Sequence, residues 1–296
     1  MYLLMKLLSV SYFFIDSPNK IRYWVMRKRK NKSVFSSEMN RSDSDSTPYT
    51  SYVERISLNP RLLNSFRRNF FYRTILEHVT YEQGKQYYSL LNNDSKELLS
   101  KNPRFHALSK VGRPRKYYFK EIGYVSPTIL RYALIAEEIE RLFGKGLGQR
   151  VVEIGIGFGG QFALLQENLE FEKYYFYDLV PVQNLTLQFL NKANQSSTKV
   201  ILGDSQDPPV LSADFVISNY AFSELPYLLQ LKYMNHIISK SKNGFMMMNS
   251  GRTNFTGRSE GKMSLDEICS FLPNAQIMEE FPKTGPDNYL IVWKSV

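Results

Sequence analysis

Short apolar runs alternate with stretches of helical periodicity in the C-terminal half of the chain. The apolar runs predict strands at residues 150–154, 174–177, 199–202, 215–218, 245–249, 276–280 and 289–293. The stretches between them predict helices at residues 161–168, 182–194, 227–239 and 264–272. Strands separated by helices are typical of a parallel sheet with helices on both faces, so we expect an α/β fold here.

The last two expected strands depart from this alternation. The segment between them, residues 281–288, is too short for a helix that could return the chain to a parallel position. We therefore expect these two strands to pair antiparallel, at or near the edge of the sheet. A mostly parallel sheet with an antiparallel C-terminal strand is the arrangement of class I methyltransferases, which are Rossmann-like, and the order of the elements predicts this fold class.

The N-terminal half is mainly helical in its pattern. Apolar residues recur at helical spacing within residues 52–105, and residues 111–119 predict a turn followed by a short strand. A longer helix is expected from the N-cap Ser126 and the first-turn Pro127 to Gly144. Residues 36–50 are polar and Ser-rich, like a linker. We expect a basic tail and linker at 1–50, a helical cap on the substrate side at 51–147 and a cofactor-binding catalytic domain at 148–296.

Positive charge is concentrated in the tail. The 296-residue chain has a net charge of +10, and residues 1–32 contain eight basic residues and one acidic residue, which gives +7 and leaves +3 for the rest. A broad basic face is therefore not expected, and neither is a nucleic-acid partner. The apolar run at 2–15 is too short to span a bilayer. Together with the basic residues that follow, it could make peripheral contact with an anionic membrane, and a disordered start explains it equally well.

The chain has a single cysteine, Cys269, so it cannot form an internal disulfide or a cysteine-based zinc cluster. The three histidines, His78, His106 and His236, are far apart in the sequence and lack metal-ligand spacing. We expect no metal site, and the scarcity of cysteine favours a reducing compartment, the cytoplasm.

A glycine-rich turn follows the first strand of the α/β domain. Gly155, Gly157 and Gly160 satisfy the spacing of a dinucleotide-binding turn, and glycines allow close approach of a ligand to the backbone. Asp178 lies 18 residues after Gly160, at the end of the next expected strand, where a carboxylate can accept both hydroxyls of a ribose. Nicotinamide dinucleotides and S-adenosylmethionine both contain this ribose, so these residues alone leave both cofactors open.

Glu153 favours S-adenosylmethionine. An acid two residues before the first glycine suits a ligand with a sulfonium and an ammonium group, and it would repel a pyrophosphate. The spacing of Glu153 from Gly155, Gly157 and Gly159 is also the methyltransferase form of the turn. Asp204, just after the third strand, is a candidate for contact with the adenine amino group, although an aspartate in a loop more often stabilises a turn.

Four segments carry a resemblance to a known family: residues 126–132, 152–160, 177–179 and 213–225. Together they resemble the sugar O-methyltransferases of bacterial surface-polysaccharide clusters. The resemblance extends from about Lys110 to Asn249 and does not cover the first 50 residues. One departure is the sequence at 156–158, where Ile-Gly-Phe replaces the Gly-Gly-Tyr that is common in the family. The resemblance implies a cytosolic enzyme that methylates a hydroxyl of a sugar or a sugar-bearing intermediate.

The end of the fourth strand is the expected methyl-transfer site, because ligands bind outside the carboxyl edge of such sheets. Asn219, Tyr220, Ser223 and Glu224 follow this strand. A sugar hydroxyl is a poor nucleophile, and Glu224 is the first candidate for its general base. Glu224 could instead cap the helix that begins near residue 226. His106 is the second candidate for the base.

Four basic residues, Arg113, Arg115, Lys116 and Arg131, could bind a phosphate or an acidic sugar, although solvated surface charge is the more common role of such residues. Asn249 could bind substrate or simply end its strand. Two other functions use the same turn: an NAD(P)-dependent oxidoreductase and a non-catalytic relative of the fold. A nucleic-acid methyltransferase is disfavoured, because the positive charge lies in the tail.

Overall fold

The computed structural model describes residues 47–253 and 259–295. The expectations for the basic tail, including its contact with a membrane surface, fall on residues 1–46 and lie outside the described residues. Within the described ranges, no helix is both long enough and apolar enough to cross a membrane.

The N-terminal part of the structure is a set of short helices that ends in a small hairpin. The helices are α3 (Thr47–Leu58), α4 (Pro60–Leu63), η3 (Phe66–Arg68), α5 (Phe70–Ile75), α6 (Tyr81–Leu90), α7 (Asn93–Lys101) and α8 (Pro103–Leu108). Strands β1 (Tyr117–Phe119) and β2 (Gly123–Val125) form an antiparallel pair. Helix α9 (Pro127–Phe143) follows, with Ser126 as its N-cap and Gly144 as its C-cap, as the sequence predicts.

The first described helix overlaps the end of the predicted linker, and the three-part division of the chain stays a prediction. Helix α3 begins at Thr47, inside the segment 36–50 that the sequence assigns to the linker. The reason is Tyr49, which is only 2% exposed and whose ring lies 6.0 Å from that of Tyr72. Burial of this one aromatic ring stabilises a turn of helix that the surrounding polar residues do not suggest.

The second part of the structure is a seven-stranded sheet. Its strands are β3 (Gly146–Ile154), β4 (Glu170–Asp178), β5 (Val200–Asp204), β6 (Phe215–Asn219), β7 (Asn243–Met248), β8 (Gln276–Glu279) and β9 (Tyr289–Trp293). They are ordered β5-β4-β3-β6-β7-β9-β8. Strands β3 to β7 pair in parallel, and β9 lies antiparallel between β7 and β8. The predicted antiparallel pairing of the last two strands is thus confirmed, with β8 at the edge.

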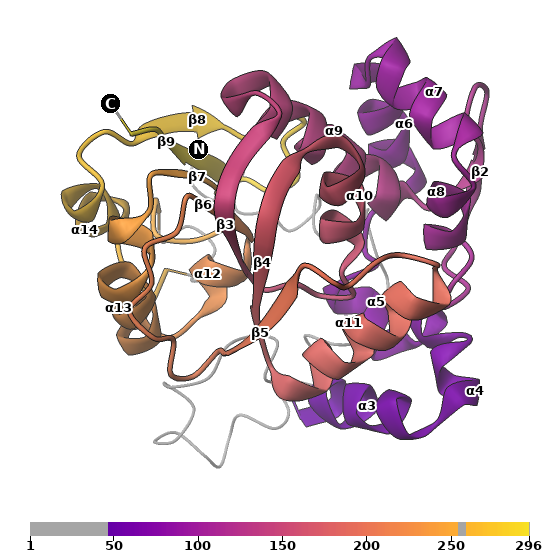
Figure 1. The fold of residues 1–296 in the computed structure, drawn as a ribbon, viewed down its shortest axis with the longest axis horizontal. Helices are drawn as coiled ribbons and strands as arrows, with labels where there is room; N and C mark the ends of the chain where they lie inside the picture. The colour runs from indigo at the N-terminus through magenta and orange to yellow at the C-terminus, as the bar shows by residue number, and fades with distance from the viewer. Residues whose placement is uncertain (1–46, 254–258, 296) are drawn as a thin grey trace, which may run out of the picture.

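Helices cover both faces of this sheet. The helices that connect its strands are α10 (Gly160–Asn168), α11 (Val180–Lys192), α12 (Ala221–Glu224), α13 (Tyr227–His236) and α14 (Leu265–Phe271). Neighbouring residues of β3 point to opposite faces, so Val151 packs in the apolar cluster of α9 to α11, whereas Val152 packs in that of α12 to α14. The cap helices lie beside α10 and α11, while α13 and α14 lie across the sheet (Figure 1).

Candidate functional site

The glycine turn between β3 and α10 has the backbone geometry that only glycine adopts freely. Gly155, Gly157 and Gly159 have φ values of 82°, 55° and 81°, in the left-handed region. The turn also lies against α12, because a Cβ atom added to Gly155 would be 2.0 Å from the Cβ of Ala221. The sharp turn that the sequence predicts is confirmed, and it brings the end of β3 next to the residues that follow β6.

Asp178 is the last residue of β4 and contacts the glycine turn directly. The backbone N–H of Gly157 donates a 3.2 Å hydrogen bond to Oδ2, and the N–H of Leu179 donates a 2.7 Å bond to Oδ1. The carboxylate is half-buried at the carboxyl edge of the sheet. A ligand seated on the glycine turn would therefore be in reach of this acid.

Asp204 ends the neighbouring strand, β5, and its register partner is Asp178. It is exposed, and its Oδ1 accepts hydrogen bonds of 2.8 Å and 3.3 Å from the backbone N–H groups of Gln206 and Asp207. These two bonds are the turn-forming role that aspartate often has after a strand. Contact of Asp204 with an adenine stays a prediction.

Glu153 is more deeply buried than the sequence argument assumes. It is 1% exposed, and the hydroxyl of Tyr174 donates a 2.9 Å hydrogen bond to its Oε2. Its pKa is raised from 4.5 to about 8, mainly by burial; the bond from Tyr174 opposes this rise, and the nearby charge of Asp178 adds to it. The sequence argument treats Glu153 as charged, whereas in the structure it is mainly a neutral acid at pH 7.

Asn219 ends β6 and connects to the first turn of α10. Its Nδ2 donates to Oε1 of Gln161 at 3.4 Å, and Nε2 of Gln161 donates to the carbonyl of Tyr132 at 3.2 Å. The Oδ1 atom of Asn219 is buried without a hydrogen-bond partner among the described residues. Gln161 was not singled out from the sequence, and the available signal was a lone amide in the apolar first part of the helix, residues 160–165.

Tyr220 has an unusual backbone conformation, with φ at 71°. A bulky residue rarely adopts this region, and such strain requires firm support from the surroundings. The support comes from two bonds: the N–H of Tyr220 donates to the carbonyl of Met247 at 2.9 Å, and the hydroxyl donates to the carboxylate of Glu280. Burial raises the pKa of the Tyr220 hydroxyl well above its ordinary value, and the nearby Glu280 raises it further.

Ser223, Glu224 and Asn249 form one connected group. The Oγ of Ser223 donates to Oδ1 of Asn249 at 2.8 Å, and Nδ2 of Asn249 donates to Oε1 of Glu224 at 2.9 Å. The structure thus brings the end of β7 to the residues after β6, as the parallel sheet requires. Asn249 holds the carboxylate of the candidate base in place.

His106 lies apart from this group. It belongs to α8, and its Nε2 is 2.8 Å from the carbonyl oxygen of Ser100 in α7. Helix α8 starts beside Glu167, where Nη1 of Arg104 and the Oε1 of Glu167 are 2.8 Å apart. Glu167 is near the end of α10, about 10 Å along that helix from the glycine turn. The structure does not bring His106 to Asn219, Tyr220 or Glu224.

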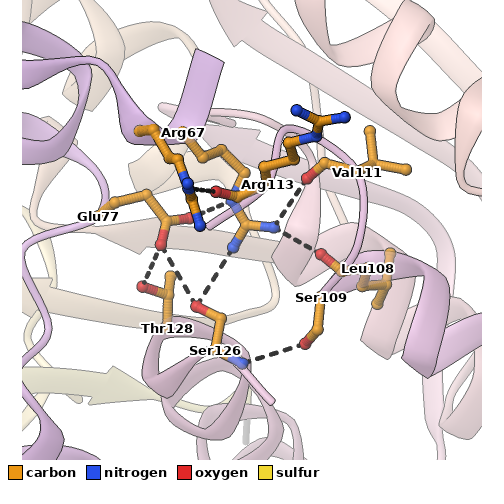
Figure 2. Close-up of polar contacts among 9 residues, drawn as sticks. Arg67, Glu77, Leu108, Ser109, Val111, Arg113, Ser126 and Thr128 are labelled. Carbon is orange, nitrogen blue, oxygen red and sulfur yellow. Dashed lines mark hydrogen bonds and ion pairs between the residues drawn. The ribbon is translucent and has the colours of Figure 1, made fainter. Parts of the chain in front are cut away.

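The cap is joined to the site by a buried ion pair (Figure 2). Arg67 is fully buried, and its Nε donates to the carboxylate of Glu77. The other oxygen of Glu77 accepts bonds from Ser126 at 3.3 Å and Thr128 at 3.1 Å, at the start of α9. The guanidinium also lies 4.3 Å from the ring centre of Phe158, inside the glycine turn. Cap, α9 and glycine turn are therefore packed as one unit.

Two further buried polar atoms lack hydrogen-bond partners within the described ranges: the hydroxyl oxygen of Tyr72 and Nε of Arg131. The Tyr72 hydroxyl and the Arg131 guanidinium both lie near the Tyr132 hydroxyl, and Asn219 is connected to the Tyr132 carbonyl through its Nδ2 and the amide of Gln161. Buried polar atoms are normally paired. A polar ligand bound near Tyr132, next to the glycine turn, could supply hydrogen bonds to these three unpaired atoms.

The four basic residues singled out in the sequence separate into two groups. Arg113, Arg115 and Lys116 are exposed, in keeping with solvated surface charge. Arg131 is 6% exposed, so the surface interpretation is wrong for this residue. The sequence signal was its position in α9, where it is the single charged residue of an apolar run at 129–136.

Comparison with known proteins gives a likeness of fold. No protein-family model matches the chain, and no curated protein matches it. An S-adenosylmethionine-dependent methyltransferase from Aquifex aeolicus is 18% identical, with a TM-score of 0.41 over 54% of this chain and 89% of that one. The PH0226 protein from Pyrococcus horikoshii is 14% identical, with a TM-score of 0.42 over 56% and 90%. The mitomycin 7-O-methyltransferase MmcR is 12% identical, with a TM-score of 0.43 over 77% and 70%. On its own strand order, with β9 antiparallel between β7 and β8, the chain has the Rossmann-like fold of class I methyltransferases.

Proposed function

We propose that this chain is an S-adenosylmethionine-dependent O-methyltransferase that acts on a sugar hydroxyl in the cytoplasm. The observation that carries the proposal is the group of residues at the carboxyl edge of the sheet. Asp178 is bonded to the glycine turn, and Asn219 and Tyr220 follow the adjacent strand. We propose no nucleic-acid partner, and we assign peripheral contact with a membrane to the N-terminal tail.

The residues of the glycine turn fit this cofactor. Asp178 would accept hydrogen bonds from the ribose hydroxyls. Asp204, its register partner at the end of β5, would contact the adenine. The three positive-φ glycines give the turn its sharp backbone, and the bond from the Gly157 N–H holds the Asp178 carboxylate beside that turn. The orphaned polar atoms around Tyr132 offer hydrogen bonds to a polar ligand. When bound, the cofactor supplies an electrophilic methyl group on a sulfonium.

The chain's own contribution to the reaction would be positioning and proton removal. Glu224 is the proposed base, because Asn249 fixes its carboxylate and Ser223 fixes Asn249 in turn. Asn219 and Tyr220 would orient the acceptor beside the methyl group, and orientation is the larger source of rate in such a displacement. Tyr220 is suited to this because its backbone and hydroxyl are both anchored. His106, the second candidate from the sequence, lies apart from this group and is bonded to the Ser100 carbonyl, so the proposal does not assign it this role.

A sugar as acceptor is supported by the resemblance alone. The segments that carry it come from four separate places in the chain, and they meet at the site. Residues 126–132 start α9, 152–160 form the glycine turn, 177–179 end β4, and 213–225 contain β6 and α12. Convergence of family motifs on one edge of the sheet is what a shared substrate and cofactor would require.

Calorimetric titration of the purified chain with S-adenosylhomocysteine and with NAD⁺ tests the cofactor. We expect micromolar binding of the first and none of the second. Asp178→Asn should weaken binding about tenfold or more, because it removes a charged acceptor. Asp207→Asn, an exposed aspartate paired with Lys232, is the matched control and should bind like the wild type. Binding of NAD⁺ alone would point to an oxidoreductase, and binding of neither ligand to a non-catalytic relative.

Transfer of a labelled methyl group to a panel of neutral and acidic sugars tests the acceptor. We expect label in at least one sugar, and its loss when that hydroxyl is blocked. Label that appears only in added protein, nucleic acid or non-sugar phenols would refute the sugar assignment while leaving methyl transfer intact.

A further inference from the structure

Arg131 is a buried charge without a carboxylate partner in the part of the chain that the structure describes. It lies in the second turn of α9 and is 6% exposed. Among residues 47–253 and 259–295, no carboxylate oxygen forms an ion pair with it, and its Nε has no hydrogen-bond acceptor. Its neighbours are aromatic: the guanidinium carbon is 5.3 Å from the ring centre of Tyr132 and 6.0 Å from that of Tyr220.

The other buried arginine of the cap region shows what a structural arginine looks like in this protein. Arg67 is fully buried, but it pairs with Glu77 and donates to the carbonyl of Leu108 and, at 3.4 Å, to that of Val111. A buried charge is strongly unfavourable unless it is paired, so an arginine kept for stability is expected to look like Arg67. Arg131 bonds to the hydroxyl of Tyr132, but among the described residues it has neither a carboxylate nor a carbonyl partner like those of Arg67.

The position of Arg131 is that of a ligand-binding residue. Tyr132, the next residue, packs its ring 5.8 Å from Phe158 of the glycine turn. Tyr220, the second ring beside the guanidinium, directly follows β6. The nearby carboxylate of Glu280 is already engaged, because it accepts bonds from the Tyr220 hydroxyl and from the backbone N–H of Thr284 at 2.8 Å. Arg131 therefore lies between the proposed cofactor and acceptor regions.

We propose that Arg131 binds a carboxylate group of a ligand in this site. The inference rests on the proposed function. A guanidinium matches a carboxylate with two parallel hydrogen bonds, and a buried pair of this kind is stronger than an exposed one. Two ligands of the proposed reaction can supply the group: the amino-acid end of the methyl donor, and an acidic sugar as acceptor. The guanidinium is buried beside two tyrosine rings, so a neutral group would not compensate its charge.

The test compares ligands with and without the carboxylate. S-adenosylhomocysteine contains the amino-acid end, and 5′-methylthioadenosine lacks it. Each is titrated calorimetrically into the wild type, Arg131→Gln and Arg141→Gln, the last being an exposed arginine of the same helix. If the donor supplies the carboxylate, Arg131→Gln weakens S-adenosylhomocysteine about 10- to 100-fold and leaves 5′-methylthioadenosine unchanged. Arg141→Gln should match the wild type for both.

A second arm tests the acceptor. Glucuronate and glucose are titrated into the same three proteins saturated with S-adenosylhomocysteine. If the acceptor supplies the carboxylate, the wild type favours glucuronate and Arg131→Gln removes that preference, while both nucleosides bind unchanged. If Arg131→Gln lost the same affinity for S-adenosylhomocysteine as for 5′-methylthioadenosine, or if no affinity changed in either arm, the inference about Arg131 would be overturned. The proposed function would not be affected by this outcome. Failure of the wild type to bind both nucleosides would remove the proposed function and this inference with it.

The wild type provides a check that does not depend on the variant folding. If Arg131→Gln is unfolded by circular dichroism, the affinity ratios of the wild type decide. A wild type that binds S-adenosylhomocysteine no better than 5′-methylthioadenosine, and glucuronate no better than glucose, contradicts the inference. Arg131→Lys keeps the charge without the two-pronged geometry, and it should restore only part of the lost affinity.

Discussion

Replacing Glu153 with Gln should make the stability of the fold less sensitive to pH. The side chain is 1% exposed, and burial raises its pKa from 4.5 to about 8. Between these two values the folded chain keeps a proton that the unfolded chain has released. The free energy of unfolding contributed by this group therefore falls as pH rises through this window. Glutamine does not titrate, and its amide oxygen can still accept the bond from Tyr174.

The size of the effect follows from the two pKa values. Each pH unit inside the window is equivalent to about 1.4 kcal/mol. From pH 4.5 to pH 7 the wild type loses about 3 kcal/mol through Glu153, and by pH 8 it loses about 4 kcal/mol, given a folded-state pKa of about 8. The variant should thus equal the wild type within about 1 kcal/mol at pH 5 and exceed it clearly at pH 8.

Urea unfolding between pH 5 and pH 9, followed by circular dichroism, measures this difference. Glu170→Gln, at an exposed glutamate that begins β4, is the control and should follow the wild type at every pH. All other titrating groups are shared by the three proteins, so they cancel in the comparison. A difference between Glu153→Gln and the wild type that stays constant from pH 5 to pH 9 would refute a buried, neutral Glu153.

Three further predictions concern other parts of the site. Glu224→Gln should lower methyl transfer about 100- to 10,000-fold with unchanged affinity for S-adenosylhomocysteine, and near wild-type turnover in a radiolabel assay would assign the residue to capping. Gly155→Ala should lower the urea midpoint of unfolding, because the new Cβ would lie 2.0 Å from that of Ala221 and a φ of 82° is strained for alanine. Adding Ala221→Gly should restore only the stability lost to the steric clash, not that lost to the backbone strain. Arg67→Met should lower the free energy of unfolding by about 3–5 kcal/mol, because it leaves Glu77 buried and without its cation. Adding Glu77→Gln should recover much of this loss, as measured by denaturant titration. Additive losses in that pair would argue against the ion pair.

The sheet was predictable from the sequence because buried parallel strands are continuous apolar runs with helices between them. The position of Asp178 was also predictable, since the spacing from the glycine turn places it at the end of the next strand. The start of helix α3 at Thr47 was not predictable, because it depends on the ring of Tyr49 packing on Tyr72, which lies in a different helix.

The protonation and burial of the site residues could be determined only from the tertiary structure. The sequence identifies Glu153 as an acid, but its neutral form at pH 7 results from its burial in the sheet, beside Tyr174 of β4. Likewise, the sequence lists Arg131 with three exposed basic residues, and only the packing of α9 against the sheet separates it from them. Arg67 and Glu77 belong to the cap, and no local pattern links them to the glycine turn.

Tyr220, one of three non-glycine residues with positive φ in the described part of the chain, lies where two of the proposed binding regions meet. Gly155 and Ala221 touch across the site, so the chain must leave β6 sharply at Tyr220 to avoid the glycine turn. A left-handed tyrosine allows this, and it persists because Met247 and Glu280 hold its backbone and hydroxyl. Glycine at this position would make the turn with less strain but would lose both the anchored hydroxyl and the ring beside the guanidinium. The strained tyrosine is thus better explained by what its side chain does in the site than by the turn itself.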